Sequence, residues 1–311
     1  MLQTPAVTGP QGAVVSPRST LQNRSEHTAQ EVAATNDIVA DALYYRFFDQ
    51  AERVRWRIAD IPWYQLQADS VSEYWKQIVA EIARSELTTF DGTHQFMTRF
   101  GKNADFSQWL AVWFYEETKH PQALMLWLDR VGVQLDHEFL VQGRSSPQFA
   151  ASWLGTLTLN VIAELLASEA YLVLSRYAPE PVLRHITQRI AADEARHAAH
   201  FFAYGQRLLA RTAQPELELK NGLEVLYLWL NSETRLDHPV GAILNTIQAT
   251  ELFREGVGVQ GFVTARLRQR VCQVIGRMLG FRLESKADVV RAMRDLIRTR
   301  NASRPRGEGQ P

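Results

Sequence analysis

The sequence predicts an all-α protein: a four-helix bundle with additional helices packed around it. Apolar residues recur at helical spacing over most of the chain, and alternating strand patterns bounded by hairpin turns are lacking. Four consecutive helical segments are each long enough to cross a bundle. The expected helices span residues 32–57, 71–91, 105–131, 147–177, 181–212, 216–233, 239–282 (with a break left open) and 286–299.

Local signals place the helix ends. Asp105 fits an N-cap for the third helix, and Gly132 fits its C-terminal stop. Ser146 followed by Pro147 predicts the start of the fourth helix, because proline is favoured at the first helical position. This fourth helix is apolar nearly all round, so we expect it inside the bundle.

Residues 31–300 are expected to form one helical domain between two tails. Residues 1–30 and 301–311 lack a hydrophobic period and are rich in polar residues, Gly and Pro, which predicts disorder. The formal net charge of zero argues against nucleic acid as the main partner. No apolar run approaches ~18 residues without a charge, so no membrane span is expected.

The cysteine content and the N-terminus bear on the compartment. Cys272 is the single cysteine, which excludes an intramolecular disulfide framework and a cysteine metal cluster. The N-terminus lacks a charged segment followed by an apolar one, so it does not read as a secretory signal. We therefore expect a cytoplasmic protein.

Two Glu-x-x-His motifs carry the chemistry that the sequence predicts. Residues three apart on a helix share a face, so Glu117 with His120, and Glu194 with His197, each aim a carboxylate and an imidazole at one point. Two such helices, with one Glu from each of two others, bind two iron or manganese ions inside a bundle. The competing interpretation places these charges on solvated helix faces, but both motifs lie in strongly apolar segments.

The two remaining carboxylates must come from the second and fourth helices. Glu86 continues an apolar stripe of the second helix, whereas Glu81 shares its face with polar residues, so Glu86 is preferred. On the fourth helix, helical periodicity does not separate Glu164 from Glu169. His200 is expected to be a packed or surface histidine.

The motifs resemble those of the soluble acyl-[acyl carrier protein] desaturases. Ala-Asp-Glu-Ala-Arg-His at 192–197 is similar to that family's Ala-Asp-Glu-Lys-Arg-His, and Glu-Glu-Thr-Lys-His at 116–120 to its Glu-Glu-Asn-Arg-His. Residues 85–90 resemble the segment with the first-helix carboxylate, and 56–60 the stretch with a Trp near the iron. The resemblance covers roughly residues 52–210 and implies a ferritin-like bundle.

The resemblance also implies roles for individual residues. It implies Glu164 rather than Glu169 as the ligand on the fourth helix, because aligning Glu164 with the family's Glu requires the smaller deletion before the second motif. Asp193 and Trp56 would lie behind the ligands, on an electron path through His120. The implied iron ligands are thus Glu86, Glu117, His120, Glu164, Glu194 and His197.

The implied activity is O2-dependent desaturation of an acyl chain held on acyl carrier protein. The implied cofactors are two iron ions, with manganese as an alternative, and the implied partners are a ferredoxin-type electron donor and a second copy of the chain. Ala167 stands where the family has Thr, and Ser168 is the nearest hydroxyl along the chain. This departure bears on proton delivery and on the reaction itself.

Two other functions remain open. A related di-iron oxygenase, such as an arylamine N-oxygenase or a hydroxylase, shares the motifs, but the N-oxygenases carry an added His where this chain has Ile190. A non-catalytic ferritin-like metal-binding protein is the second alternative. The long helical region after residue 212 favours an enzyme over a bare metal-binding bundle.

Overall fold

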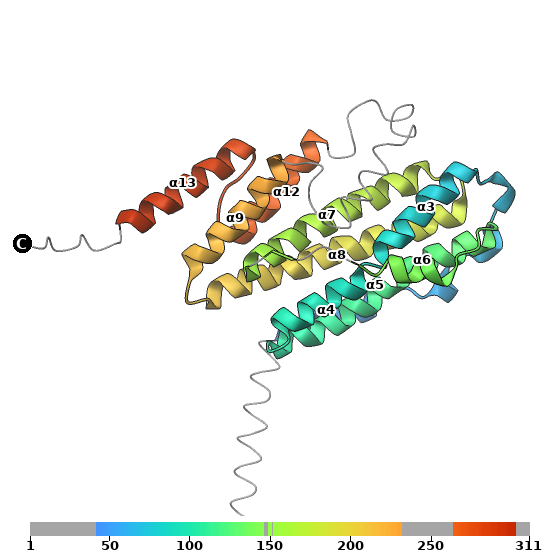
Figure 1. Ribbon diagram of the computed structural model, residues 1–311, viewed down its shortest axis with the longest axis horizontal. Helices are drawn as coiled ribbons and strands as arrows, with labels where there is room; N and C mark the ends of the chain where they lie inside the picture. Colours follow the sequence, from blue (N-terminus) through green and yellow to red (C-terminus); the bar gives the residue numbers. More distant parts are fainter. Residues whose placement is uncertain (1–41, 146–148, 151, 232–263, 303–311) are drawn as a thin grey trace, which may run out of the picture.

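A computed structural model describes residues 42–145, 149–150, 152–231 and 264–302 of the chain (Figure 1). The described residues form helices joined by turns and contain no strand, so the predicted all-α class is confirmed. In chain order the α-helices are α2 (Leu43–Val54), α3 (Glu73–Glu86), α4 (Thr89–Phe100), α5 (Ala104–Arg130), α6 (His137–Gln142), α7 (Trp153–Tyr177), α8 (Pro181–Arg211), α9 (Pro215–Asn231), α12 (Ala265–Leu279) and α13 (Lys286–Ala302). Three short 3₁₀ turns, Ile58–Asp60, Trp63–Gln65 and Ala68–Ser70, connect α2 to α3.

Helices α7 and α8 form the centre of the molecule. They are joined by a short connection through Pro179 and pack against each other along their length. Helix α3 packs on α5, and α5 packs on α8 (Figure 1). Helices α2 and α4 cover α5, whereas α9 and α12 cover α7 and α8, with α13 packed on α9. The interior between α3, α5, α7 and α8 is where the motif residues meet.

A buried carboxylate starts α8 at the turn after α7. Glu180 is fully buried and accepts hydrogen bonds from the backbone N–H of Val182 and Leu183, as an N-cap does. It also accepts from the backbone N–H of Gln67 and from Nε1 of Trp127. This one side chain therefore holds the start of α8 against α5 and the 3₁₀ turns.

Two predicted helix starts are wrong. Asn103, not Asp105, caps α5 by accepting from Phe106 N–H, because helix α5 begins one residue before Asp105. The fourth helix begins at Trp153 behind the cap Ser152, although Ser146 lies outside the described residues. The predicted stop at Gly132 is confirmed: its φ of 86° suits glycine, and its backbone N–H closes the helix end on Asp129.

Asp105 has another role. Its carboxylate accepts hydrogen bonds from the backbone N–H of Leu43 and Tyr44, and it pairs with Arg207 of α8. An acidic side chain beside free N–H groups stabilises the start of a helix. Asp105 thus fixes α2 onto α5 and α8, rather than starting its own helix.

Other predicted boundaries differ from the structure. Helices α4 and α6 were not predicted. The expected helix over 71–91 has no stop at residue 91, because Gly92 lies inside α4, facing Phe149. Residues 55–57 are not helical, so the first helix ends at Val54, earlier than predicted. Helix α13 continues to Ala302, two residues into the predicted tail. The predicted tail 1–30, residues 303–311 and most of the predicted helix 239–282 lie outside the described residues.

Helix α7 is long and apolar enough to cross a membrane by length and composition, the single such helix among the described residues. However, 78% of its most apolar stretch is buried against the other helices. The same composition is expected for the innermost helix of a bundle.

Candidate metal centre

Six side chains from four helices converge in the interior. They form two sets of four metal-binding groups, and within each set the candidate ligand atoms lie within 4.8 Å of one another. The first set is Glu86, Glu117, His120 and Glu194, and the second is Glu117, Glu164, Glu194 and His197. All six predicted ligand residues are present and all are buried, so the interpretation of these charges as solvated is wrong.

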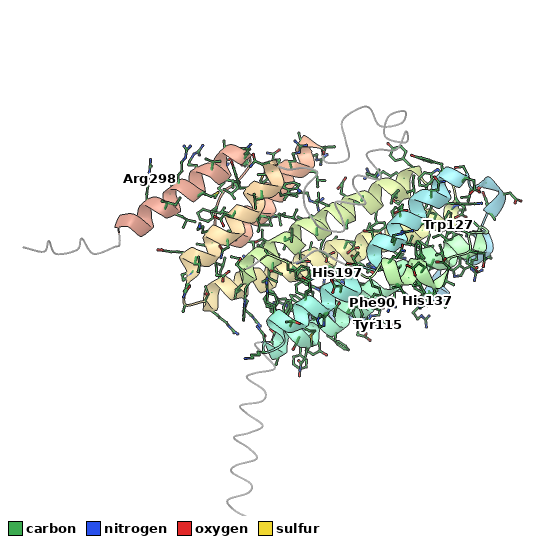
Figure 2. All side chains as sticks on the ribbon, viewed as in Figure 1. Phe90, Tyr115, Trp127, His137, His197 and Arg298 are labelled. Carbon is green, nitrogen blue, oxygen red and sulfur yellow. The ribbon has the colours of Figure 1, made fainter. Side chains whose placement is uncertain are left out.

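Helical spacing explains the convergence. Helix α5 supplies Glu117 and His120, α8 supplies Glu194 and His197, and single carboxylates come from α3 and α7. Figure 2 labels His197 near the middle of the molecule and Trp127 toward the end that carries α6. The two Glu-x-x-His pairs therefore face each other across the α5–α8 contact, midway along the long helices.

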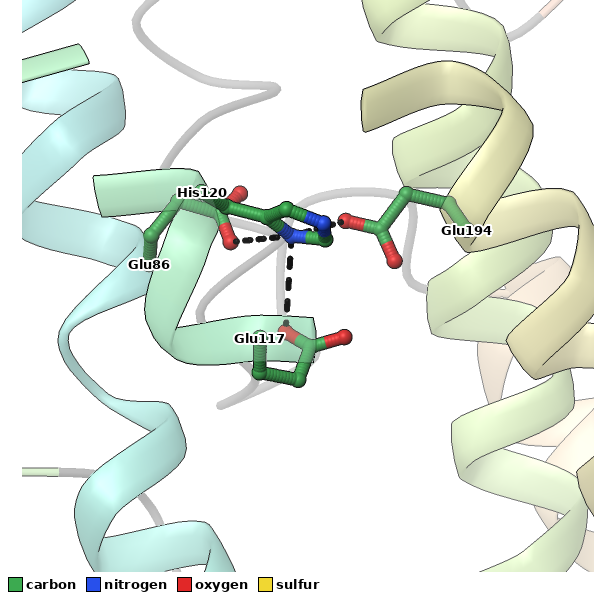
Figure 3. Close-up of side chains that lie close together, drawn as sticks. All are labelled: Glu86, Glu117, His120 and Glu194. Carbon is green, nitrogen blue, oxygen red and sulfur yellow. Dashed lines mark ion pairs between the residues drawn. The ribbon is translucent and has the colours of Figure 1, made fainter. Parts of the chain in front are cut away.

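Each histidine presents Nδ1 to the carboxylates. His120 Nδ1 lies 3.5 Å from Glu86 Oε2 and 3.4 Å from Glu194 Oε1 (Figure 3). His197 Nδ1 lies 2.7 Å from Glu117 Oε1 and 3.3 Å from Glu194 Oε2. Both imidazoles are fully buried, so their Nδ1 atoms meet the carboxylates out of contact with bulk water.

The outward nitrogen of each ring meets another carboxylate. His120 Nε2 lies 3.3 Å from Asp193 Oδ2, and His197 Nε2 lies 3.2 Å from Glu116 Oε2. Although burial raises the pKa of the Glu116 carboxyl, the hydrogen bond and charge of His197 outweigh it and lower this pKa to about 2. An ionised carboxylate at Nε2 holds the ring proton there, which leaves the Nδ1 lone pair to bind metal.

Three of the candidate ligand carboxylates have perturbed pKa values. Burial, followed by the charge of Glu194, raises the pKa of Glu117 to about 7, and the same causes raise the pKa of Glu164 well above its usual range. Burial also opposes the ionisation of Glu194, but the charge of His120 lowers its pKa below the ordinary value. Four carboxylates packed this closely repel one another, so they require positive charge among them.

The residues present could hold a divalent cation. Glu117 Oε1 and His120 Nδ1 are buried without a hydrogen-bond partner among the described residues, although other acceptor atoms surround them. A bound cation would satisfy such buried polar atoms, which otherwise lack a partner. A mixture of carboxylate oxygens and imidazole nitrogens is typical of iron and manganese sites.

Side-chain hydrogen-bond donors hold three of the candidate ligand carboxylates. Tyr171 donates its hydroxyl proton to Glu86, and Trp113 Nε1 donates to Glu164 Oε1 at 3.3 Å. Thr89 Oγ donates to Glu117 Oε2 at 3.3 Å. These contacts cross between helices and restrict how the carboxylates rotate.

Asp193 and Trp56 lie on the side of His120 that faces away from the carboxylates. Trp56 is buried, and its Nε1 donates to Asp193 Oδ2 at 2.7 Å. The same Asp193 oxygen meets His120 Nε2. The contacts Trp56–Asp193–His120 are thus continuous.

The structure also places the other residues that the sequence analysis considered. Glu169 is partly exposed and pairs with Arg270 outside the centre, and Glu81 is exposed on α3. His200 is buried between Trp109 and Gln50, as expected for a packed histidine. Ser168 donates its hydroxyl proton to the backbone oxygen of Ala191, so it does not offer that proton to the centre.

Sequence reasoning missed several groups of the centre. Glu116 lies about 100° around α5 from Glu117 and faces His197 of α8. A signal was present, because both motifs carry an acidic residue directly before their Glu, at Glu116 and Asp193. Tyr171, Trp113 and Thr89 have no such signal, since their partners lie far away in the sequence.

No protein-family model matches the chain. The chemistry of the buried centre is therefore the main indication of its function.

Proposed function

We propose that this protein is an O2-dependent di-iron oxidase with a ferritin-like bundle, and that it desaturates an acyl chain presented on acyl carrier protein. One observation carries the di-iron part. Glu117 and Glu194 belong to both donor sets, so the residues present could hold two metal ions side by side. A pair of Glu-x-x-His helices with two further carboxylates is the arrangement of di-iron and di-manganese bundles.

In this proposal Glu86 and His120 would hold one iron, and Glu164 and His197 would hold the other. Glu117 and Glu194 would be available to both. When bound and reduced, the two irons supply O2 activation and the oxidising power that removes hydrogen from the substrate. Manganese can occupy the same donors.

The protein's own residues fix the geometry and exclude water. Asp193 and Glu116 orient the two imidazoles through their Nε2 atoms. Tyr171 orients the carboxylate of Glu86, and Trp113 that of Glu164. The imidazoles are fully buried, which strengthens every electrostatic interaction at the centre.

Hydroxyl groups near the ligands bear on proton delivery. Ala167 stands in place of the family's Thr, and Ser168 is bonded to Ala191, whereas the hydroxyl of Thr89 donates to the shared carboxylate of Glu117. Thr89 is half-buried, so it lies between the surface and the centre. We assign to Thr89 the movement of a proton toward Glu117.

The acyl substrate and the partners rest on the motif resemblance. The Ala-Asp-Glu-x-Arg-His and Glu-Glu-x-x-His segments support a desaturase, with a ferredoxin-type donor and a homodimer as further parts of the proposal. Trp56, Asp193 and His120 offer a route for the electrons from that donor, since they are in direct contact.

Product analysis tests the proposed reaction. Protein loaded with Fe(II) under argon is reduced and given a long-chain acyl carrier protein and O2, and the released acyl chain is analysed by mass spectrometry. We expect a product lighter by two hydrogens. A product heavier by one oxygen indicates hydroxylation instead, and oxidation of an arylamine without acyl turnover indicates an N-oxygenase; either result overturns the desaturase assignment.

A further inference from the structure

A single nitrogen of Arg196 joins the two carboxylates behind the histidines. Arg196 Nη2 donates to Asp193 Oδ1 at 2.7 Å and to Glu116 Oε1 at 2.8 Å. The arginine is buried, with 8% of its surface exposed. Charge-assisted hydrogen bonds between buried groups are short, directional and costly to break. Arg196 therefore fixes the relative position of Asp193 on its own helix and Glu116 on α5.

The second oxygen of each carboxylate continues the connection to a histidine. Asp193 Oδ2 meets Nε2 of His120, and Glu116 Oε2 meets Nε2 of His197. The resulting series of contacts runs from His120 through Asp193, Arg196 and Glu116 to His197. It links one histidine of each donor set along a route that bypasses Glu117 and Glu194.

Arg196 serves both histidines, although the motif is repeated. The position matching Arg196 in the first motif is Lys119, which is also buried but faces another way. Lys119 Nζ donates to the backbone oxygen of Trp56 at 3.3 Å and lies 4.8 Å from the centre of its indole ring. Arg55 Nε approaches Glu116 only to 3.8 Å. Among the described residues, the link behind the two rings therefore depends on one guanidinium.

We propose that Arg196 is a positioning residue that couples the two metal positions. The inference rests on the proposed two-metal centre. A metal at the first set fixes the ring of His120, and the contacts through Asp193, Arg196 and Glu116 then restrict the ring of His197 before the second metal arrives. The second metal loses less conformational freedom on binding, which makes pairwise occupation favourable.

Manganese loading below saturation tests this coupling. Metal-free protein receives one Mn(II) per chain, and electron paramagnetic resonance separates spin-coupled pairs from isolated ions. In the wild type we expect nearly all bound Mn(II) in pairs. In Arg196→Gln we expect the paired share to fall toward about half, the statistical value for two equal and independent sites.

The variants are chosen to separate coupling from folding. Arg184→Gln is the matched control, because Arg184 lies on the same helix and donates to the backbone of Ala178 and Pro179, away from the centre. It should keep the wild-type pairing. If Arg196→Gln does not fold, Glu116→Gln cuts the same link, while its amide oxygen still accepts from His197. It should show the same loss of pairs.

Each result has a distinct meaning. Unchanged pairing in a folded Arg196→Gln or Glu116→Gln protein overturns the coupling role and leaves the two-metal centre standing. Recovery of pairs in Arg196→Lys supports it, since an ammonium group can again bond both carboxylates. A wild type that binds no Mn(II) pair at any loading refutes the two-metal centre, and the coupling with it.

Discussion

The imidazole rings of His120 and His197 face each other across α5 and α8, with 6.1 Å between their centroids and 29° between their planes. Each ring belongs to a Glu-x-x-His motif and turns the same nitrogen, Nδ1, toward the carboxylates. The motifs are thus two copies of one local structure that share a common centre. The predictions below follow from this arrangement and from the buried groups that support it.

Loss of a shared carboxylate should remove most of the metal. Glu117 and Glu194 each belong to both donor sets, so Glu117→Ala and Glu194→Ala disturb both positions. Elemental analysis after anaerobic Fe(II) loading should give close to two irons per chain in the wild type and a small fraction of that in either variant. Glu81→Ala, which changes an exposed carboxylate of α3, is the control. Full iron content in the double variant would falsify the site.

Glu164 and Glu169 should differ sharply. Glu164 lies in the centre and accepts from Trp113, whereas Glu169 pairs with Arg270 near the surface. Glu164→Gln should abolish the O2-dependent oxidation of bound Fe(II), followed by absorbance, while circular dichroism shows the fold intact. Glu169→Gln should oxidise iron at nearly the wild-type rate. The reverse order would place the ligand elsewhere on α7.

Metal should stabilise the folded protein. Six buried ligand side chains converge only in the native state, so metal binds that state in preference to the unfolded chain. At a free metal concentration of 100 times Kd, the expected gain is about 2.7 kcal/mol. Thermal unfolding with Mn(II) and with a chelator should show a higher midpoint with metal, and Glu117→Ala should show no difference. Equal midpoints in the wild type would contradict a native metal centre.

His200 should make stability fall at mildly acidic pH. Burial, followed by the charges of His197 and Arg196, lowers the pKa of His200 to about 3. Trp109 Nε1 donates to its Nδ1, which keeps that nitrogen unprotonated. Below the unfolded pKa of about 6.5 the unfolded chain therefore binds a proton that the folded chain does not.

Because the unfolded chain binds more protons, the free energy of unfolding falls as the pH falls. The contribution of His200 to stability is present above about pH 6.5 and is lost as the pH falls, by about 1.4 kcal/mol per pH unit until about pH 3. Urea unfolding at about pH 7 and about pH 5.5 should show a smaller loss in His200→Gln than in the wild type. His137→Gln, at an exposed position, should behave like the wild type. Identical pH dependence in all three proteins would exclude this role.

Glu180 should matter for stability although it lies outside the metal centre. It caps α8 and accepts from Trp127 Nε1 and Gln67 N–H, so its removal leaves several buried donors unpaired. Glu180→Ala should lower the free energy of unfolding by about 2–4 kcal/mol in denaturant titrations. Glu180→Gln should lose less, because its amide oxygen still accepts. As a comparison, Asp136→Ala removes the exposed cap of α6 and should cost about 1 kcal/mol or less.

Local sequence rules were sufficient to select five of the six candidate ligands. The spacing of Glu117 and His120 places them on one face, and the apolar stripe of α3 selects Glu86 over Glu81. The choice of Glu164 over Glu169 needed the family resemblance, since α7 is apolar all round. Where local rules were ambiguous, as with Gly92 inside α4, the predicted boundary was wrong.

The groups around the ligands were harder to predict. Tyr171 contacts Glu86 and Trp113 contacts Glu164 across helix interfaces, and residues so far apart in sequence are brought together by helix packing alone. The role of Glu116 could not be predicted from the first motif alone, because its partner His197 lies on α8.

Two indole rings are hydrogen-bonded to the centre, Trp56 through Asp193 and Trp113 directly to Glu164. The emission of an indole responds to nearby charge and is quenched by a neighbouring paramagnetic ion. If metal binds at the centre, the protein's own indole fluorescence should therefore report it. Replacing Trp56 or Trp113 singly with Phe would assign the signal to one side of the centre or the other, and would allow the filling of each position to be followed in real time without any added label.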